Sequence, residues 1–321
     1  MTLSQFLSLW NDGSPFIQVK TSGSTGTPKL MLVEKKRMWE SARATCDFLG
    51  LKKGDTALLC MSLDYIAGKM MVVRALQRQL HLLEVPVSGY PMADNVLEGR
   101  TIDFAAMVPL QVYNSIQDPY QLERLKGIRH LLIGGGALDP DLEQKLSEFP
   151  HAVWCSYGMT ETLSHIALRR VNGPTASQWY TPLPGVRVTI NDQQCMVIEA
   201  PLVCQQTLVT NDMGEMAPDG RRFRIVGRKD NVICSGGVKI QAEEVERLLN
   251  PHLSFPFFIT KMKDEKYGEI VVLVAETKDN KKLDDIFHDV LPSYWIPRKV
   301  IFVDSLPRTE TGKPKRHIDG R

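Results

Sequence analysis

The sequence lacks cysteine pairs at the C-x-x-C spacing that zinc and redox sites use. Its cysteines are scattered, and most lie in apolar stretches, which indicates reduced, buried thiols rather than a zinc site. They are Cys46, Cys60, Cys155, Cys195, Cys204 and Cys234.

The sequence also has little of what membrane and nucleic-acid proteins need. No run reaches the roughly 18 apolar residues of a membrane span. Residues 1–10 lack the basic start and apolar segment of a secretion signal. A formal net charge of +2 is too small to favour nucleic acid or an anionic membrane as the main partner. We therefore expect a cytoplasmic protein with small-molecule partners, and a homo-oligomer is compatible with the sequence.

The first half of the chain alternates strand-like and helix-like segments. Met38, Ala42, Cys46 and Leu49 recur at helical spacing, and Gly50 predicts the end of that helix. Further helices are expected at 67–77 and 140–148, and strands at 56–63, 80–85, 104–108, 128–133 and 152–156. The pattern predicts an α/β fold, a sheet covered by helices, that binds ligands beyond the carboxyl ends of its strands.

The pattern changes after Gly173. Short alternating runs flank Asn191-Asp192, which is a hairpin signal and predicts a small β-rich piece. A compact α+β module is expected to follow, with strands at 223–226, 255–260, 270–275 and 300–303 and helices at 242–249 and 282–290. A chain of 321 residues suggests two domains. We place them at 1–228 and 229–321.

One stretch near the N-terminus has the composition of a phosphate-binding loop. Two glycines allow a close approach of the backbone to a ligand, and hydroxyls, N–H groups and a lysine can contact phosphate oxygens. The stretch consists of Thr21, Ser22, Gly23, Ser24, Thr25, Gly26, Thr27, Pro28 and Lys29. A proline before the lysine and a leucine after it exclude the P-loop NTPase pattern. From composition alone, a flexible polar hairpin and a triphosphate clamp stay open as equal alternatives.

Two more polar stretches follow predicted buried strands, at 134–136 and 156–162, and should lie beside each other at one edge of the sheet. The candidate nucleotide-binding residues there are Gly135, Gly136, Ser156, Tyr157 and Gly158. Glu161 can serve as a Mg²⁺ ligand, because Mg²⁺ typically takes one or two carboxylates together with substrate phosphates. Taken alone, a solvated glutamate at a helix N-terminus is the simpler interpretation of Glu161.

These stretches, together with 210–212, 227–231, 235–246 and 306–313, resemble in sequence order the motifs of the acyl-adenylate-forming enzymes. That family includes acyl-CoA synthetases, adenylation domains and luciferases, and the resemblance covers nearly the whole chain. It implies that residues 21–29 hold the ATP phosphates. It also implies that Thr160 and Glu161 serve the metal and phosphates, and that Tyr157 lies against adenine.

The later motifs carry the rest of the implied site. Asp212 would accept hydrogen bonds from the ribose hydroxyls, with Asn211 where the family has glycine, and Arg228 would contact ribose or phosphate. Asp230 would be the hinge of a mobile C-terminal domain, and Lys313 its catalytic lysine. The coenzyme A contacts implied are Ser235, Gly236, Gly237 and Lys239.

The family usually carries a long subdomain before the phosphate loop, and here only residues 1–20 precede it. Either this subdomain is dispensable, or the chain is a reduced or non-catalytic relative. The retained Glu161, Asp212, Arg228 and Lys313 favour the first explanation.

The resemblance implies an AMP-forming acid–thiol ligase that uses ATP, Mg²⁺ and coenzyme A. A carboxylate would be converted to an acyl-adenylate with release of pyrophosphate, and a thiol would then take the acyl group. Residues 181–186 and 164–165 resemble most the 2-succinylbenzoate:CoA ligases of menaquinone biosynthesis. The second carboxylate of such a substrate needs a cation or hydroxyls. Candidates are Tyr65, Lys69, Arg74, Ser164 and His165, although Lys69 and Arg74 can equally be surface charges on a helix.

Two other functions stay open. An aminoacyl- or aryl-adenylating enzyme that feeds a carrier protein could hold a substrate ammonium with Asp64, although Asp64 also suits a helix N-cap. A non-catalytic nucleotide-binding relative has no use for Lys313. No convincing Ser-His-Asp or Cys-His arrangement is present, and the histidines at 130, 151, 252 and 288 are predicted to be structural or surface residues.

Overall fold

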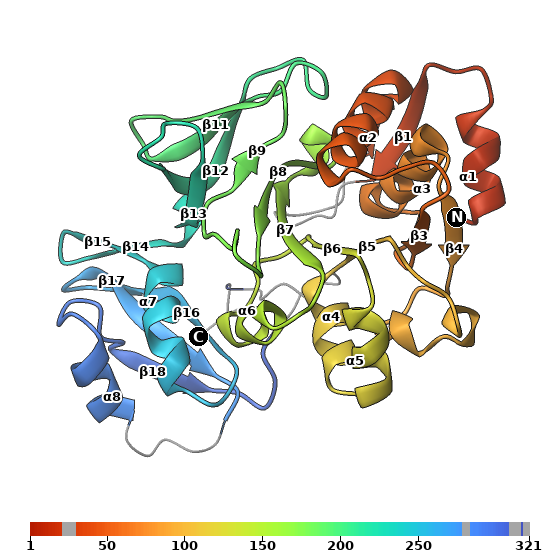
Figure 1. Cartoon of the computed structure of the whole chain (residues 1–321). Coiled ribbons are helices and arrows are strands. Elements are labelled where there is room, and N and C mark those ends of the chain that lie inside the picture. The colour runs from red at the N-terminus through yellow and green to blue at the C-terminus, as the bar shows by residue number, and fades with distance from the viewer. Residues whose placement is uncertain (21–29, 278–282, 308–315, 317–321) are drawn as a thin grey trace. The chain divides into compact units, whose positions relative to one another are not determined.

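The structure is a computed structural model and describes residues 1–20, 30–277, 283–307 and 316 (Figure 1). The chain divides into two compact units. The first comprises Met1–Val188, Ile198–Leu208 and Ala217–Phe223, and the second comprises Thr189–Val197, Val209–Met216 and Arg224–Arg321. The second unit therefore contains the C-terminal module and two segments that precede it in the sequence.

A seven-stranded sheet of order β4-β3-β5-β6-β7-β8-β9 forms the centre of the first unit. Its strands are β3 (Thr56–Leu59), β4 (His81–Glu84), β5 (Phe104–Met107), β6 (His130–Ile133), β7 (Ala152–Gly158), β8 (His165–Arg170) and β9 (Thr181–Pro182). The strands from β4 to β7 run parallel, and β8 and β9 add antiparallel. All four residues of β5 are buried, as expected for a parallel strand covered on both faces. The carboxyl ends of the parallel strands thus share one edge.

The helices of this unit are α1 (Leu3–Trp10), α2 (Lys35–Leu49), α3 (Ile66–Arg78), α4 (Pro109–Ile116), α5 (Pro119–Lys126) and α6 (Pro140–Ser147). Short 3₁₀ turns lie at Pro91–Ala93, Asn95–Leu97 and Thr160–Thr162. Before α2, strands β1 (Phe16–Lys20) and β2 (Leu30–Glu34) pair antiparallel.

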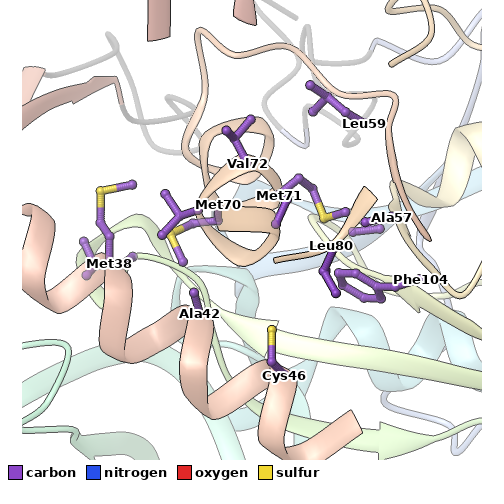
Figure 2. Packing of buried hydrophobic residues seen from close by; sticks show 14 of the residues in the cluster. Met38, Ala42, Cys46, Ala57, Leu59, Met70, Met71, Val72, Leu80 and Phe104 are labelled. Atoms are coloured by element: carbon purple, nitrogen blue, oxygen red, sulfur yellow. The ribbon is translucent and has the colours of Figure 1, made fainter. Parts of the chain in front are cut away.

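The core of the first unit explains the helical spacing seen in the sequence. Met38, Ala42 and Cys46 repeat every four residues along one side of α2, and Figure 2 shows them beside Met70 of α3. All four side chains are fully buried, which secures the packing of α2 on α3. The helix ends at Gly50, whose φ of 65° is a left-handed conformation that glycine adopts at little cost.

A four-stranded sheet of order β10-β11-β12-β13 follows in the chain. Its strands are β10 (Arg187–Ile190), β11 (Cys195–Glu199), β12 (Leu208–Met216) and β13 (Phe223–Arg228). At the turn between β10 and β11, the Asn191 side-chain oxygen accepts hydrogen bonds from the backbone of Gln193 at 3.0 Å and of Cys195 at 2.9 Å. The predicted hairpin at Asn191 is confirmed.

In its described residues, the C-terminal module of the second unit is a five-stranded sheet with two α-helices. Its elements are the 3₁₀ turn η4 (Lys229–Asn231), β14 (Val232–Ser235), β15 (Val238–Gln241), α7 (Ala242–Leu249), the turn Asn250–His252, β16 (Phe257–Asp264), β17 (Gly268–Ala275), α8 (Leu283–Val290) and β18 (Lys299–Phe302). The strand order is β15-β14-β17-β16, and β18 pairs parallel with β17. Ile233, Val245, Leu273 and Phe287 form the centre of its core and are fully buried.

The predicted class, an α/β domain with a β-rich piece and a small α+β module, is confirmed. The strand expected at 56–63 was too long, because β3 ends at Leu59 and the chain then turns into α3. The boundary between residues 228 and 229 stays a prediction. Four of the six cysteines are buried as expected, whereas Cys204 is half-buried and Cys234 is exposed. In the described part of the chain, no helix combines the length and apolar character that crossing a bilayer requires.

Candidate functional site

The strand ends of β6 and β7 lie side by side, as predicted. The backbone N–H of Gly134 donates to the Met107 carbonyl oxygen at 3.0 Å, and the Ser156 hydroxyl donates to the Ile133 carbonyl at 3.1 Å. A Cβ atom on Gly134 would lie 2.4 Å from the Ser156 Oγ, so a larger residue would displace the Ser156 hydroxyl. Gly135 takes a φ of +83°. The two predicted binding stretches therefore form one compact edge of the sheet.

The loop after β7 is fixed from within and presents its acidic side chain outward. The buried Thr162 hydroxyl accepts a hydrogen bond from the Met159 N–H at 3.0 Å and lies 2.8 Å from the Ser164 carbonyl oxygen. Thr160 is half-buried and Glu161 is exposed. The loop can thus offer a carboxylate and a hydroxyl to a metal–phosphate group without losing its own contacts. The described residues contain no group of three histidine, cysteine or acidic side chains that could bind a metal by themselves.

Tyr157 lies on the opposite side of β7 from Ser156. Its ring packs edge-on against Phe223 at 5.5 Å and Tyr180 at 6.1 Å between centroids, and its exposure is 7%. The end of β7 is therefore packed against an aromatic cluster. A contact between Tyr157 and adenine stays a prediction.

Three of the predicted acyl-site residues are joined by contacts in one polar group, and a fourth, Lys69, is buried on the same helix as Arg74. Arg74 donates to the Ser164 Oγ at 2.6 Å, Ser164 lies 3.4 Å from the His165 Nδ1, and Lys69 donates to the Leu63 carbonyl. Lys69 and Arg74 are each 2% exposed, so their interpretation as surface charges is wrong. Both residues are buried because α3, which carries them, has apolar residues on nearly all of its faces and is buried on most of its surface.

Burial shifts the protonation of this group toward neutral forms. It lowers the pKa of the Arg74 guanidinium to about 10 and lowers the pKa of the Lys69 ammonium. Burial, together with the nearby Arg74 charge, holds the pKa of the His165 imidazole well below its usual value. His165 is therefore neutral at pH 7, and the positive charge beside it is that of Arg74.

No local sequence pattern indicated Thr45, whose hydroxyl lies 2.9 Å from the His165 Nε2 in the buried interior. Tyr65 is the residue before α3, and its backbone carbonyl accepts the Lys69 N–H at 3.3 Å. A role of the Tyr65 ring in substrate binding stays a prediction.

Asp64 does not cap α3, contrary to the simpler sequence interpretation. Its carboxylate accepts hydrogen bonds from the Met1 ammonium at 3.0 Å and from the Ser62 hydroxyl at 3.1 Å. These contacts draw the side chain away from the helix start, which has no side-chain cap.

In the second unit, three predicted residues form a chain of ion pairs. Arg228 lies 3.2 Å from the Asp212 carboxylate and 3.0 Å from the Asp230 carboxylate. Asn211, the departure from the family's glycine, donates to Asp230 at 3.3 Å. The predicted ribose-binding aspartate and the predicted hinge aspartate thus share one cation, and the asparagine supports the same arrangement.

The predicted coenzyme A residues sit on one hairpin. Gly236 and Gly237, with φ of 57° and 86°, form the two-residue turn between β14 and β15, a combination that favours glycine at both positions. Lys239 is exposed, whereas Ser235 is 3% exposed, so its hydroxyl is withdrawn from solvent. A role of these residues toward coenzyme A stays a prediction.

Two protein-family models match the chain. The family model of the AMP-binding enzymes matches residues 14–203, and the model of the C-terminal domain of AMP-binding enzymes matches residues 259–313. The chain belongs to the AMP-binding enzyme family.

This AMP-binding enzyme is similar to two curated 2-succinylbenzoate–CoA ligases. It is 28% identical over 271 residues to the ligase from Salmonella typhimurium, and this alignment covers 80% of this chain and 57% of the relative. It is 24% identical over 325 residues to the one from Bacillus cereus strain Q1, covering 92% of this chain and 67% of the relative. The chain thus spans little more than half of the Salmonella relative.

Two solved structures are similar to this AMP-binding enzyme. The acyl-CoA synthetase (AMP-forming)/AMP-acid ligase II-like protein from Dyadobacter fermentans has 32% identity and a TM-score of 0.67, covering 97% of this chain and 91% of that one. The Bacillus subtilis O-succinylbenzoate coenzyme A synthetase, in complex with ATP and magnesium ion, has 23% identity and a TM-score of 0.76. The match covers 93% of this chain and 68% of that one, and at this identity it supports the fold alone.

Two predicted parts of the AMP-binding enzyme lie outside the described residues. One is the phosphate loop at 21–29, and the other is Lys313 with its neighbours. Their roles stay predictions.

Proposed function

We propose that this AMP-binding enzyme is an ATP-dependent acid:CoA ligase that activates 2-succinylbenzoate, a step of menaquinone biosynthesis. The observation that carries the proposal is the edge of the sheet at β6 and β7. There the exposed Glu161 and half-buried Thr160 follow β7, and the Gly134–Gly136 stretch follows the neighbouring strand β6, in a member of this family. The names of the similar ligases support the choice of substrate.

The proposed reaction has two steps at one site. The substrate carboxylate attacks the α-phosphorus of ATP, and the bond to the β-phosphate oxygen breaks to release pyrophosphate. The thiol of coenzyme A then attacks the acyl carbon and AMP leaves. Negative charge builds on phosphate oxygens in the first step, so positioned cations and N–H donors supply most of the catalysis.

Each part of the chain has a proposed role in these steps. Residues 21–29 and Lys313 contact the phosphates, and Asp212 accepts from the ribose hydroxyls. Glu161 and Thr160 fit Mg²⁺, because Mg²⁺ usually takes one or two carboxylates together with substrate phosphates, and Glu161 is exposed. The bound ion would neutralise charge on the phosphates. We further propose a domain of residues 1–228 that binds ATP and the acyl substrate, a mobile domain of residues 229–321, and a cytoplasmic location.

The buried polar group supports a substrate with a second carboxylate. Arg74 and Lys69 have no carboxylate within 4.0 Å in the described part of the chain, and the Arg74 Nε has no hydrogen-bond partner there. A buried cation without an anion is costly, and a substrate carboxylate would relieve that cost. We propose that Arg74 and Ser164 bind the carboxylate that does not react.

The function is tested by pyrophosphate release from ATP over a panel of aromatic, fatty and amino acids. We expect 2-succinylbenzoate to support release and coenzyme A to be consumed in equal amount. Pyrophosphate release with simple monocarboxylates but not with 2-succinylbenzoate contradicts the proposed substrate. Release with amino acids identifies an aminoacyl-adenylating enzyme, and no release with any acid leaves a non-catalytic relative.

Ser164→Ala should raise the KM for 2-succinylbenzoate by about 10-fold and leave kcat little changed, because it removes the hydrogen-bond partner of Arg74.

Glu161→Gln should weaken magnesium-dependent adenylation without unfolding the protein. The exposed carboxylate makes no described contact that holds the loop, since Thr162 does so, and the amide is a poorer ligand for Mg²⁺. We expect the magnesium concentration for half-maximal rate to rise about 10-fold, measured by pyrophosphate release in a magnesium titration. Glu148→Gln, an exposed carboxylate after α6, is the matched control. Identical titrations for Glu161→Gln and wild type would remove Glu161 from the metal site.

A further inference from the structure

Thr45, on the buried side of α2, connects that helix to the start of β8. Its hydroxyl donates to the Ser41 carbonyl oxygen at 3.1 Å, one turn back along α2, and lies 2.9 Å from the His165 Nε2. Thr45 is fully buried and His165 is 7% exposed. Both contacts of the hydroxyl are therefore made inside the protein, within the first unit.

The chemistry of these groups fixes the direction of each hydrogen bond. A threonine hydroxyl has one hydrogen, and a carbonyl oxygen can only accept. Because the Thr45 hydrogen points to the Ser41 carbonyl, the Thr45 oxygen accepts, and the His165 Nε2 must carry a hydrogen and donate it. Burial and the nearby Arg74 charge hold the pKa of His165 well below its usual value, so the neutral ring has only that hydrogen. The His165 Nδ1 is therefore an acceptor.

This Nδ1 atom faces the Ser164 hydroxyl. The Ser164 Oγ accepts from the Arg74 guanidinium at 2.6 Å and lies 3.4 Å from the His165 Nδ1. A guanidinium can only donate, so the hydrogen of the Ser164 hydroxyl is free to point to Nδ1. Each group thus donates to the next in one direction, in the order Arg74, Ser164, His165, Thr45 and the Ser41 carbonyl.

The other tautomer of His165 would break this order. With its hydrogen on Nδ1, the ring would turn a second donor toward the Ser164 oxygen that Arg74 uses, and the Thr45 oxygen would lose its donor. We propose that Thr45 is a positioning residue that holds His165 in the Nε2–H tautomer and so keeps the Ser164 oxygen as an acceptor for Arg74. This inference rests on the proposed function, in which Arg74 and Ser164 bind the carboxylate that does not react.

The first test measures the tautomer directly. In protein labelled with ¹⁵N-histidine, the chemical shifts of the ring nitrogens show which of them is protonated, and the His165 signals are identified by their loss in His165→Gln. We expect a protonated Nε2 and an unprotonated Nδ1 in the wild type at pH 7. Thr45→Val removes the hydroxyl, so the hydrogen should move to Nδ1, where the Ser164 oxygen can accept it. A protonated Nδ1 in the wild type, or an unchanged tautomer in Thr45→Val, overturns the proposal.

The second test measures the consequence for substrate binding. Thr45→Val should raise the KM for 2-succinylbenzoate by about 2- to 10-fold, the range of one neutral hydrogen bond, with little change in kcat. Thr45→Ser restores a hydroxyl and should return the KM and the ring-nitrogen shifts close to wild type. An unchanged KM in Thr45→Val, or an equal rise in Thr45→Ser, overturns the positioning role.

Ser41→Ala is the matched control. The Ser41 hydroxyl is buried one turn from Thr45 on the same helix, and it has no hydrogen-bond partner among the described residues. Its removal should leave the His165 shifts and the KM unchanged. Effects equal to those of Thr45→Val would show that the site responds to any change in the packing of α2, and would overturn the proposal.

These tests also distinguish the inference from the proposed function. A wild-type protein that releases no pyrophosphate with any acid refutes the function, while the ring-nitrogen shifts still decide whether Thr45 sets the tautomer. Thermal unfolding of each variant shows whether the first unit remains folded. The wild-type shifts need no variant, so they test the proposal even when Thr45→Val does not fold.

Discussion

Lys313→Ala is expected to lower acyl-adenylate formation by about 10²- to 10³-fold, the usual effect of removing one group that stabilises transition-state charge. Thioester formation from supplied acyl-adenylate should be spared. The reason is that, in the proposed two-orientation mechanism, the lysine would serve the first step alone. Lys315→Ala, two residues further on, is the matched control.

Asp230→Pro should show the opposite pattern, because proline fixes φ and stiffens the proposed hinge. Asp230→Ala is its control, since alanine also removes the carboxylate that contacts Arg228 and Asn211 but leaves the backbone free to rotate. Both half-reactions are measured separately for each variant. If the lysine and proline variants depress the two steps in equal proportion, the two-orientation mechanism is wrong for this protein.

Gly158→Ala should destabilise the first unit by about 3 kcal/mol or more, because the clash is with backbone that cannot turn aside. A Cβ atom there would lie 2.3 Å from the Ser164 carbonyl oxygen and 2.5 Å from the His165 Cα. Relief requires β7 and β8 to separate at their bulge, which also displaces the loop that carries Thr160 and Glu161. We expect a lower midpoint in urea unfolding and a large loss of pyrophosphate release.

Gly136→Ala is the control for the stability measurement alone, because its Cβ would meet only the Pro109 side chain at 3.7 Å, an ordinary contact. A Gly158→Ala protein with wild-type stability would show that β7 and β8 can shift without cost.

The elements that the sequence predicted well are those with a strong local signal. Met38, Ala42 and Cys46 mark α2 by their spacing, and Asn191 marks its hairpin by its turn chemistry. The helices α4 and α5 were missed although each begins with proline at its first turn, a signal available in the sequence. The burial of Lys69 and Arg74 could also have been predicted from the sequence, because the residues around them are apolar on every side of the helix.

Other parts of the candidate site leave no local trace. Thr45 and His165 are 120 residues apart in the chain, and neither has a neighbouring pattern that predicts the pair. Such contacts depend on how whole elements pack, which spacing and propensity do not encode. The glycines at 134 and 158 belong to recognisable motifs, yet their closeness to the next strand appears only in three dimensions.

The exposed Cys234 on β14 makes the module accessible to site-selective labelling. Of the six thiols, all within the described residues, it is the exposed one, whereas burial raises the pKa of Cys46, Cys60 and Cys155 and keeps them unreactive. A maleimide fluorophore will therefore attach beside the Gly236-Gly237 turn without any engineered cysteine. Its emission would test, in the native sequence, whether the module moves as the proposed mechanism requires.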